Sequence, residues 1–406
     1  MEVTAHEVTV RDLRGYQLRC YWAALASFER HQRPRHRGRR RHGLELLRRR
    51  TRGRFFPPSR IVIFKRTVLS GLVAELPPEV WTSDEVERRL APLYGRLKLP
   101  EGRLELMTGI RERRFWPQAI RPSAASALAG RRAMQAAGVG PADIDLLIHS
   151  SVCRDRLEPS TAAYVHGLLG LGSQAQILDV SNACLGFLNA VVLAAGMVES
   201  GQIRRALVCS GEDGRPLVER TIRMLNEDFS LTRETIKPYF ANLTIGAGGA
   251  AAVICRDDLA LPGSIRLLGG AAETDSSANG LCEGDTSSAE LDMRTDSEAL
   301  LAAGVALAQR CWGRFKGVTG WDESTPHRVV THQVGRRHSS LLFEKLGLDP
   351  AKDYQSFDRL GNVGSVSVPA TLALGLAEGR IKAGDRVALL GIGSGLASMM
   401  LAVECQ

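Results

Sequence analysis

The sequence predicts an α/β fold in which two similar halves are built around a mostly parallel sheet. The first indication is an alternation of strand-like and helix-like segments, which places helices on both faces of such a sheet. Apolar runs of strand length occupy 143–151, 175–181 and 204–212, and helical patterns separate them. The second indication is a repeated spacing. Cys184 precedes Gly201 by 17 residues, and Asn362 precedes Gly379 by the same number.

The repeat extends to both sides of these segments. After each glycine the chain makes a short turn and enters another strand, and upstream "IDLLIHSS" is similar to "HRVVTHQVG". Two related halves would bring two helix N-termini to a shared centre and set Cys184 opposite Asn362. We therefore expect an N-terminal half over 60–258 and a C-terminal half over 259–406.

Apolar period and flanking glycines assign the elements of both halves. In chain order they are an opening strand or hairpin (60–76), a helix (123–140), a strand (143–151), a helix (160–170), a strand (175–181), a helix from Cys184, a strand (204–212), a strand (327–335), a helix after Asn362 and a final strand (386–395). Between the halves, 213–244 is charged and helical, which predicts a cap over a substrate channel. The segment 274–296 is polar throughout, which predicts a loop.

Positive charge is concentrated at the N-terminus. Residues 1–60 hold 16 arginines and five acids, whereas the whole chain has a net charge of +9. The rest of the chain is nearly neutral, which argues against nucleic-acid binding. Residues 1–59 could be a nucleic-acid arm, a targeting peptide or sequence translated ahead of the true start. Without interleaved aromatics or an apolar signal core, they are predicted to form a disordered tail.

The eight cysteines are scattered, with no C-x-x-C pair and no zinc-finger spacing. This pattern is typical of a reducing, cytoplasmic protein and offers no zinc site. We also expect no other metal and no cofactor. No apolar run reaches the ~18 residues that a membrane span needs. We expect a cytoplasmic enzyme with no membrane span.

Cys184 lies where a strand is predicted to end and a long apolar helix to begin. A cysteine in an apolar setting is often a buried structural residue. At a helix N-terminus, however, free N–H groups and the helix dipole favour the thiolate and can stabilise a thioester oxyanion. The alternatives are a core residue and an acyl-accepting nucleophile.

His332 and Asn362 favour the nucleophile. His332 ends a predicted strand, where its side chain can reach a cleft at the edge of a sheet, and Asn362 is the repeat counterpart of Cys184. A thiol, an imidazole and an amide suit Claisen chemistry, because the thiol holds an acyl group while the other two donate to an enolate oxygen.

The loop "GIGSG" contains Gly393 and Ser394. It lacks the third glycine of a dinucleotide fingerprint, and only 11 residues follow it. We instead expect it to bring a backbone N–H against the reacting thioester.

The motifs together resemble a known family. "TGIRERRFW", "NACLGF" around Cys184, "THQV" with His332, "LGNVGSVSVPATL" with Asn362 and "GIGSGLA" are similar to the thiolase superfamily, in the branch of ketoacyl-acyl-carrier-protein synthase III. The resemblance covers about residues 60–406. It implies a five-layered αβαβα fold and an obligate homodimer. It also implies Cys184 as the acyl-accepting nucleophile, with His332 and Asn362 serving the second substrate.

Glu158 indicates a subfamily. It lies 26 residues before Cys184 and directly before Pro159 and Ser160. A glutamate here resembles the acyl-CoA head-to-head condensing enzymes of olefin biosynthesis (OleA). In that family this glutamate enters the neighbouring subunit's site and removes the α-proton of a second acyl-CoA, because a plain acyl thioester cannot form a carbanion by losing CO₂. The other reading is an acid that stabilises a helix N-terminus. The segment 243–254 lacks the aspartate of the F-G-D-G motif common in carrier-protein synthases.

Three functions stay open from the sequence. The first is condensation of two acyl-CoA molecules to a 2-alkyl-3-oxoacyl thioester without decarboxylation. The second is decarboxylative 3-oxoacyl-carrier-protein synthesis from a malonyl donor, and the third is a non-catalytic thiolase-fold subunit that stabilises a partner. Arg111, Arg113 and Arg114 are candidates for receiving the phosphate groups of CoA or a carrier protein.

Overall fold

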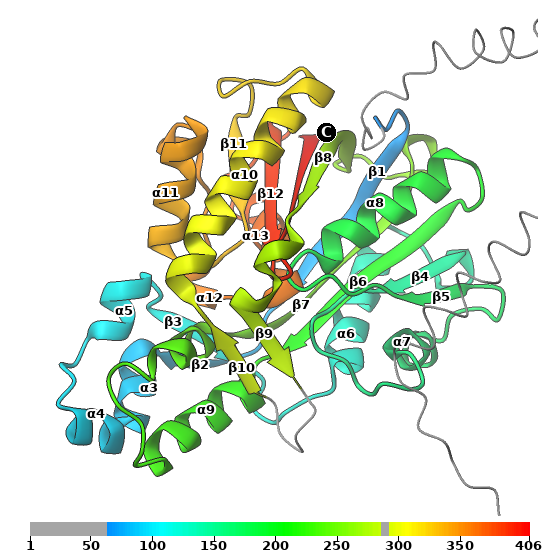
Figure 1. Ribbon diagram of the computed structural model, residues 1–406. Coiled ribbons are helices and arrows are strands. Elements are labelled where there is room, and N and C mark those ends of the chain that lie inside the picture. The colour runs from blue at the N-terminus through cyan, green and yellow to red at the C-terminus, as the bar shows by residue number, and fades with distance from the viewer. Residues whose placement is uncertain (1–62, 286–291) are drawn as a thin grey trace, which may run out of the picture. The chain divides into compact units, whose positions relative to one another are not determined.

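The computed structural model describes residues 63–285 and 292–406, which lie in one unit (Figure 1). The predicted tail over 1–59 lies outside the described residues. Among the helices of the described residues, none is long and apolar enough to cross a membrane.

A nine-stranded sheet runs through this unit in the order β11-β12-β13-β8-β1-β7-β6-β4-β5. Its strands are β1 (Thr67–Glu75), β4 (Leu146–His149), β5 (Gln176–Asp179), β6 (Arg205–Asp213), β7 (Ala247–Arg256), β8 (Ile265–Thr274), β11 (Arg328–Thr331), β12 (Arg386–Gly393) and β13 (Ala397–Cys405). A strand lies at each position where the apolar runs predicted one.

The prediction of a mostly parallel sheet is wrong. β4 pairs in parallel with β5 and β6, and β11 pairs in parallel with β12, but the other five pairs along this order are antiparallel. A parallel pair needs a long crossover, whereas β12 and β13 are joined by the short turn 394–396. Apolar periodicity identifies a strand but carries no information about the direction of its neighbour.

Helices cover both faces of each half of the sheet and produce five layers, as predicted. On one outer side, α6 (Pro122–Ala136) and α7 (Thr161–Leu169) pack on β4, β6 and β7. On the other, α10 (Ser297–Thr319) and α11 (Arg336–Leu346) pack on β8, β11, β12 and β13. Between the two halves lie α8 (Gly186–Glu199) and α13 (Ser367–Ala377).

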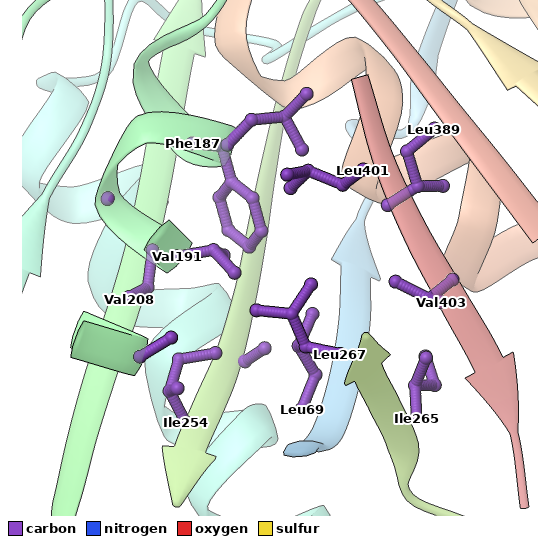
Figure 2. Packing of buried hydrophobic residues seen from close by; sticks show 14 of the residues in the cluster. Leu69, Phe187, Val191, Val208, Ile254, Ile265, Leu267, Leu389, Leu401 and Val403 are labelled. Atoms are coloured by element: carbon purple, nitrogen blue, oxygen red, sulfur yellow. The ribbon is translucent and has the colours of Figure 1, made fainter. Parts of the chain in front are cut away.

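The central layer explains why the segment after Cys184 is apolar almost all round. α8 buries Phe187 and Val191 in a cluster that draws on both halves of the sheet (Figure 2). A helix packed between the two halves of the sheet has little surface left for water, so its sequence loses the polar face of an ordinary surface helix. Other members of the cluster are Leu69, Ile254, Leu267, Leu389, Leu401 and Val403.

The repeated 17-residue spacing marks two equivalent helix ends. Gly201 follows α8 with a φ of 72°, and Gly379 follows α13 with a φ of 65°. Glycine adopts this left-handed conformation without the steric cost of a side chain, and it commonly terminates a helix. The two segments singled out by the spacing are thus corresponding parts of the two halves.

Smaller elements form a core of their own beside the sheet (Figure 1). Trp81 and Leu93 pack there with Leu225 of the predicted cap segment. The helical character predicted for 213–244 is confirmed, while its role as a cap stays a prediction. The elements are β2 (Glu79–Thr82), α3 (Ser83–Arg89), α4 (Ala91–Leu97), α5 (Arg103–Thr108), β3 (Glu112–Phe115), α9 (Arg215–Glu227) and the 3₁₀ helix η2 (Lys237–Thr244).

The segment 274–296 is more ordered than its polar composition predicted. β9 (Cys282–Asp285) and β10 (Asp292–Thr295) form an antiparallel pair within it, so the prediction of a plain loop is wrong. The Asn242 side chain of η2 donates to the carbonyl of Met293 in β10 at 3.0 Å. The remaining short helices are η1 (Pro141–Asp143), η3 (Asp257–Leu259), η4 (Ser276–Leu281), η5 (Pro350–Lys352), α12 (Phe357–Leu360) and η6 (Gly364–Val366).

The two ends of the large sheet differ. Every residue of β5 is exposed, Ile177 and Leu178 included. At the other end β11 is largely buried, and the Tyr354 N–H donates to the Val329 carbonyl at 3.0 Å. The Tyr354 segment therefore contacts the outer edge of β11, whereas in the described part of the chain no strand pairs with the outer edge of β5, which is a free edge there.

Candidate active site

Cys184 sits in a tight turn between β5 and α8. The Leu185 N–H donates to the Asn182 carbonyl at 2.9 Å, and α8 begins only at Gly186. Ala183 has a φ of 45°, a left-handed conformation that costs a residue other than glycine about 1–3 kcal/mol. The strained turn fixes the backbone at Cys184 just before the first helical residue.

The structure contradicts the expected thiolate. Burial, followed by the nearby carboxyl of Glu212 and by Cys282, raises the pKa of Cys184 to about 12. The helix N-terminus favours the anion, but removal of the sulfur from water outweighs it. Cys184 as a whole residue is half-buried. With this pKa, the Cys184 thiol is neutral at physiological pH.

The two repeated turns meet, as predicted. Ser365, three residues after Asn362, donates its hydroxyl to the Ala183 carbonyl at 2.9 Å. A Cβ at Gly186 would lie 3.0 Å from the same hydroxyl oxygen, so glycine at the start of α8 leaves room for the contact. Cys184 and Asn362 thus belong to one junction between the halves.

Asn362 is held by its backbone and by one end of its amide. Its N–H donates to the Thr244 carbonyl at 2.9 Å, and its carbonyl accepts from the Gly246 N–H at 2.9 Å. Its side-chain Oδ1 accepts from the Gly364 N–H at 3.0 Å. Because Oδ1 is engaged, Nδ2 is the atom that can donate to a substrate oxygen.

His332 follows β11 and is 3% exposed. Its N–H donates to the Leu390 carbonyl of β12 at 2.9 Å, and within the described part of the chain its Nδ1 has no hydrogen-bond partner. Burial, together with nearby His338, lowers its pKa to about 3. The imidazole is therefore neutral at physiological pH and carries one N–H that can donate.

β12 links His332 to the Cys184 turn. From Leu390 the strand continues to Gly393, where a Cβ would lie 3.4 Å from the Cys184 nitrogen and 3.3 Å from the Asn182 carbonyl. The backbone of Gly393 thus lies beside Cys184, where the sequence placed it. Ser394 is the next residue, in the turn to β13, and is partly exposed.

Glu158 is exposed, in the loop between β4 and α7. The loop ends at the free edge of the sheet, since the Asp179 carboxylate of β5 accepts the Thr161 and Ala162 N–H groups, each at 2.7 Å.

The three candidate arginines do not converge. Arg113 is fully buried, and its guanidinium donates to the Trp81 carbonyl and the Ser83 hydroxyl. It cannot meet a phosphate at the surface, so this part of the prediction is wrong. Successive residues of β3 point to opposite faces, which separates Arg113 from partly buried Arg114. Arg111 is exposed and pairs with Asp358 at 3.0 Å.

Glu212 was missed as a site residue. It lies near the end of β6, is 3% exposed, and accepts hydrogen bonds from three backbone N–H groups. An acid in the otherwise apolar strand "ALVCSGE" was the available signal.

In residues 63–285 and 292–406, no group of three or more His, Cys, Asp or Glu residues could hold a metal ion.

Comparison with known proteins places this site in a family. Two family models match, 3-oxoacyl-[acyl-carrier-protein] synthase III over residues 178–268 and its C-terminal counterpart over 318–405. An acyl-CoA:acyl-CoA alkyltransferase of Xanthomonas campestris pv. campestris is 41% identical over 344 residues, which are 84% of this chain and 99% of that protein. This chain belongs to the acyl-CoA:acyl-CoA alkyltransferase family. A Shewanella oneidensis alkyltransferase is 35% identical over 349 residues, 84% of this chain and 99% of its own.

Solved structures of the alkyltransferase OleA match the fold. A cysteine-to-alanine variant from Xanthomonas campestris superimposes with a TM-score of 0.81 at 39% identity, covering 86% of this chain and 99% of that one. A cysteine-to-serine variant with bound lauric acid and lauroyl-CoA gives a TM-score of 0.80 at 39% identity, covering 84% of this chain and all of its own. The predictions of a thiolase-like fold, an acyltransferase and an OleA-like subfamily are confirmed. The roles of the individual site residues stay predictions.

Proposed function

We propose that this protein condenses two acyl-CoA thioesters head to head to a 2-alkyl-3-oxoacyl-CoA, forming a carbon–carbon bond. The observation that carries the proposal is the match to acyl-CoA:acyl-CoA alkyltransferases over 99% of their length. The junction of the Cys184 turn, the Asn362 turn and β12 supports it, because Claisen chemistry needs a thiol with hydrogen-bond donors nearby. Solved OleA variants include replacements of a cysteine, a glutamate and a histidine, the residue types proposed here.

The first step is transfer of an acyl group to Cys184. The Cys184 sulfur bonds to the thioester carbon, the bond from that carbon to the CoA sulfur breaks, and the thiol proton leaves on CoA. One thioester and one thiol react to give another thioester and another thiol, so the step needs no cofactor. The backbone of Gly393 lies beside Cys184, so we assign the N–H groups at the Cys184 turn and at Gly393 as the donors to the developing oxyanion.

The second step joins the two chains. Glu158 takes the α-proton of a second acyl-CoA, and the enolate oxygen is held by the N–H of His332 and by Nδ2 of Asn362. The α-carbon attacks the acyl-Cys184 carbon, the carbon–sulfur bond to Cys184 breaks, and the thiolate recovers the proton that Glu158 removed. The neutrality of His332 suits it to donate to the enolate oxygen.

We propose that Glu158 acts in the site of a second copy. It is exposed in its own chain, and its loop ends beside the free edge of β5. The unpaired backbone N–H and C=O groups of a free strand edge can form hydrogen bonds with another strand. Pairing of β5 with β5 of a second copy would build a two-fold homodimer. Such a dimer carries each Glu158 loop onto the partner chain.

The first experiment is mass spectrometry of the purified protein incubated with one long saturated acyl-CoA and no malonyl donor. We expect a 2-alkyl-3-oxo acid, or the ketone from its decay. Glu158→Ala should lower product formation by about 10²–10⁴-fold, the usual worth of a general base, while Cys184 still becomes acylated. A product that appears only with an added malonyl carrier would instead establish the decarboxylative reaction.

Mixed dimers test whether Glu158 acts in trans. Cys184→Ala and Glu158→Ala chains are inactive alone, but refolding them together places an intact Glu158 opposite an intact Cys184. Equal mixing should restore about a quarter of the activity, since half of the dimers would be mixed, each with one working site. No recovery, with mixed dimers confirmed by native mass spectrometry, would show that Glu158 serves its own chain or has no catalytic role.

A further inference from the structure

The buried carboxylate of Glu212 connects two loops that are far apart in the sequence. Its Oε1 accepts from the Val152 N–H at 2.8 Å and from the Ser365 N–H at 3.1 Å. Its Oε2 accepts from the Cys153 N–H at 3.0 Å. A buried carboxylate is unfavourable unless its oxygens are hydrogen-bonded, and backbone N–H groups fill that role here.

Each of these loops leads to a residue of the proposed reaction. Val152 and Cys153 begin the loop that runs on to Glu158 between β4 and α7. Ser365 lies three residues after Asn362, and its hydroxyl donates to the carbonyl of Ala183, the residue before Cys184. One carboxylate therefore joins the Glu158 loop, the Asn362 loop and, through Ser365, the Cys184 turn.

The Asn362 loop is shaped to this carboxylate. Gly364 has a φ of 53°, and a Cβ there would lie 2.9 Å from Glu212 Oε1 and 3.2 Å from Val152 Cγ2. Both the conformation and the space favour glycine at this position. Burial raises the pKa of Glu212, and the N–H donors at Val152, Cys153 and Ser365 oppose that rise.

We propose that Glu212 is a positioning residue that holds the Glu158 loop and the Asn362 loop in place relative to the Cys184 turn. This inference rests on the proposed condensation. Acylation of Cys184 uses a turn that is stabilised by its own backbone hydrogen bonds. Condensation requires the Glu158 loop, the Asn362 loop and the Cys184 turn at the same time. In a two-fold dimer, the Glu158 loop that Glu212 holds reaches the active site of the other chain. Loss of Glu212 should therefore impair condensation more than acylation.

Two variants separate the length of the side chain from its charge. Glu212→Gln keeps the length and one acceptor oxygen, but sets an amide donor against the Cys153 N–H. Glu212→Asp keeps the charge and is shorter by one methylene, so it cannot reach all three N–H groups. The matched control is Asp213→Asn, because Asp213 is buried in the same strand but accepts instead from the Ile120 and Arg215 N–H groups, each at 3.2 Å.

The experiment measures acylation of Cys184 and formation of the condensed product separately for each full-length protein. We expect both Glu212 variants to lose about a hundredfold in the condensation rate, as misplacement of a reacting group by about 1 Å does. Acylation should fall much less, and Asp213→Asn should keep both rates. Equal losses in the two steps, or wild-type condensation in both variants, would overturn the proposal.

Hydrogen exchange distinguishes a failure of this inference from a failure of the proposed function. In both Glu212 variants, peptides covering 150–158 and 361–367 should exchange faster than in the parent protein, and in Asp213→Asn they should not. Unchanged exchange in the Glu212 variants would overturn the role of Glu212 in holding the loops. A parent protein that forms no condensed product would refute the proposed function, while the exchange result still decides whether Glu212 holds the loops.

Discussion

Cys184 shows how a correct location can come with a wrong protonation state. The sequence placed it at a helix N-terminus opposite Asn362, and the structure brings the two turns together through Ser365. A sequence shows which residue begins a helix, and therefore where the helix dipole favours an anion. It does not show how deeply the side chain is buried, or that the carboxyl of Glu212 lies near Cys184. For the same reason Arg113 could be proposed to receive a phosphate group, although the pleat of β3 buries it.

The pH dependence of Cys184 alkylation tests this protonation state. With a pKa of about 12, only a small fraction is thiolate at neutral pH, and that fraction rises about tenfold per pH unit. The rate of iodoacetamide labelling at Cys184, followed by peptide mass spectrometry, should increase from pH 7 to pH 10 without a plateau. A plateau near pH 8 in the parent protein would contradict the neutral thiol.

At the scale of elements, sequence patterns identified most strands and helices of the two halves. They left β7, β8, β13, α10 and α11 unassigned, and they failed on relations between elements. The antiparallel direction of β7, β8 and β13 depends on which strand lies alongside, and the β9–β10 pair forms within a polar segment whose composition predicts a loop. The small core around Trp81 also went unassigned, because its short elements are stabilised by packing on the distant α9 rather than by their own periodicity.

The proposed pairing of β5 with a second copy can be tested by placing positive charge on this strand. In a two-fold pairing of β5 with its copy, Ile177→Lys and Leu178→Lys set like charges close together across the interface, which destabilises the pair. The double variant should elute as a monomer in size-exclusion chromatography with light scattering, keep its circular dichroism, and lose condensation. Val80→Lys is the control, because Val80 is similarly exposed on strand β2 outside the large sheet. A double variant that stays dimeric would place the interface elsewhere.

At the scale of the whole molecule, buried histidines make the fold sensitive to acid. Burial lowers the pKa of His149 to about 4, of His332 to about 3 and of His338 to about 4. As the pH falls below about 6.5, the unfolded chain binds protons that the folded chain excludes until pH 3–4. Stability is therefore lost as the pH falls through this window.

His149→Gln should reduce that loss. The cost of excluding a proton from His149 at pH 5 is about 2 kcal/mol, so the variant should lose less of its unfolding free energy between pH 7.5 and pH 5. Asp179 Oδ1 lies 3.8 Å from Nδ1 and attracts the proton, but burial outweighs it. Denaturant titrations at the two pH values measure the change, with His166→Gln on the more exposed surface of α7 as the control. Equal losses in the parent protein and His149→Gln would contradict the assignment.

The unequal ends of the sheet also decide how far self-assembly can go. A molecule with two open strand edges could add copies indefinitely and grow into a fibre. Here the Tyr354 N–H already donates to the Val329 carbonyl of β11, and we propose that a second copy pairs at β5 instead. In the proposed dimer this pairing uses the β5 edges of both copies, so we expect assembly to stop at two chains.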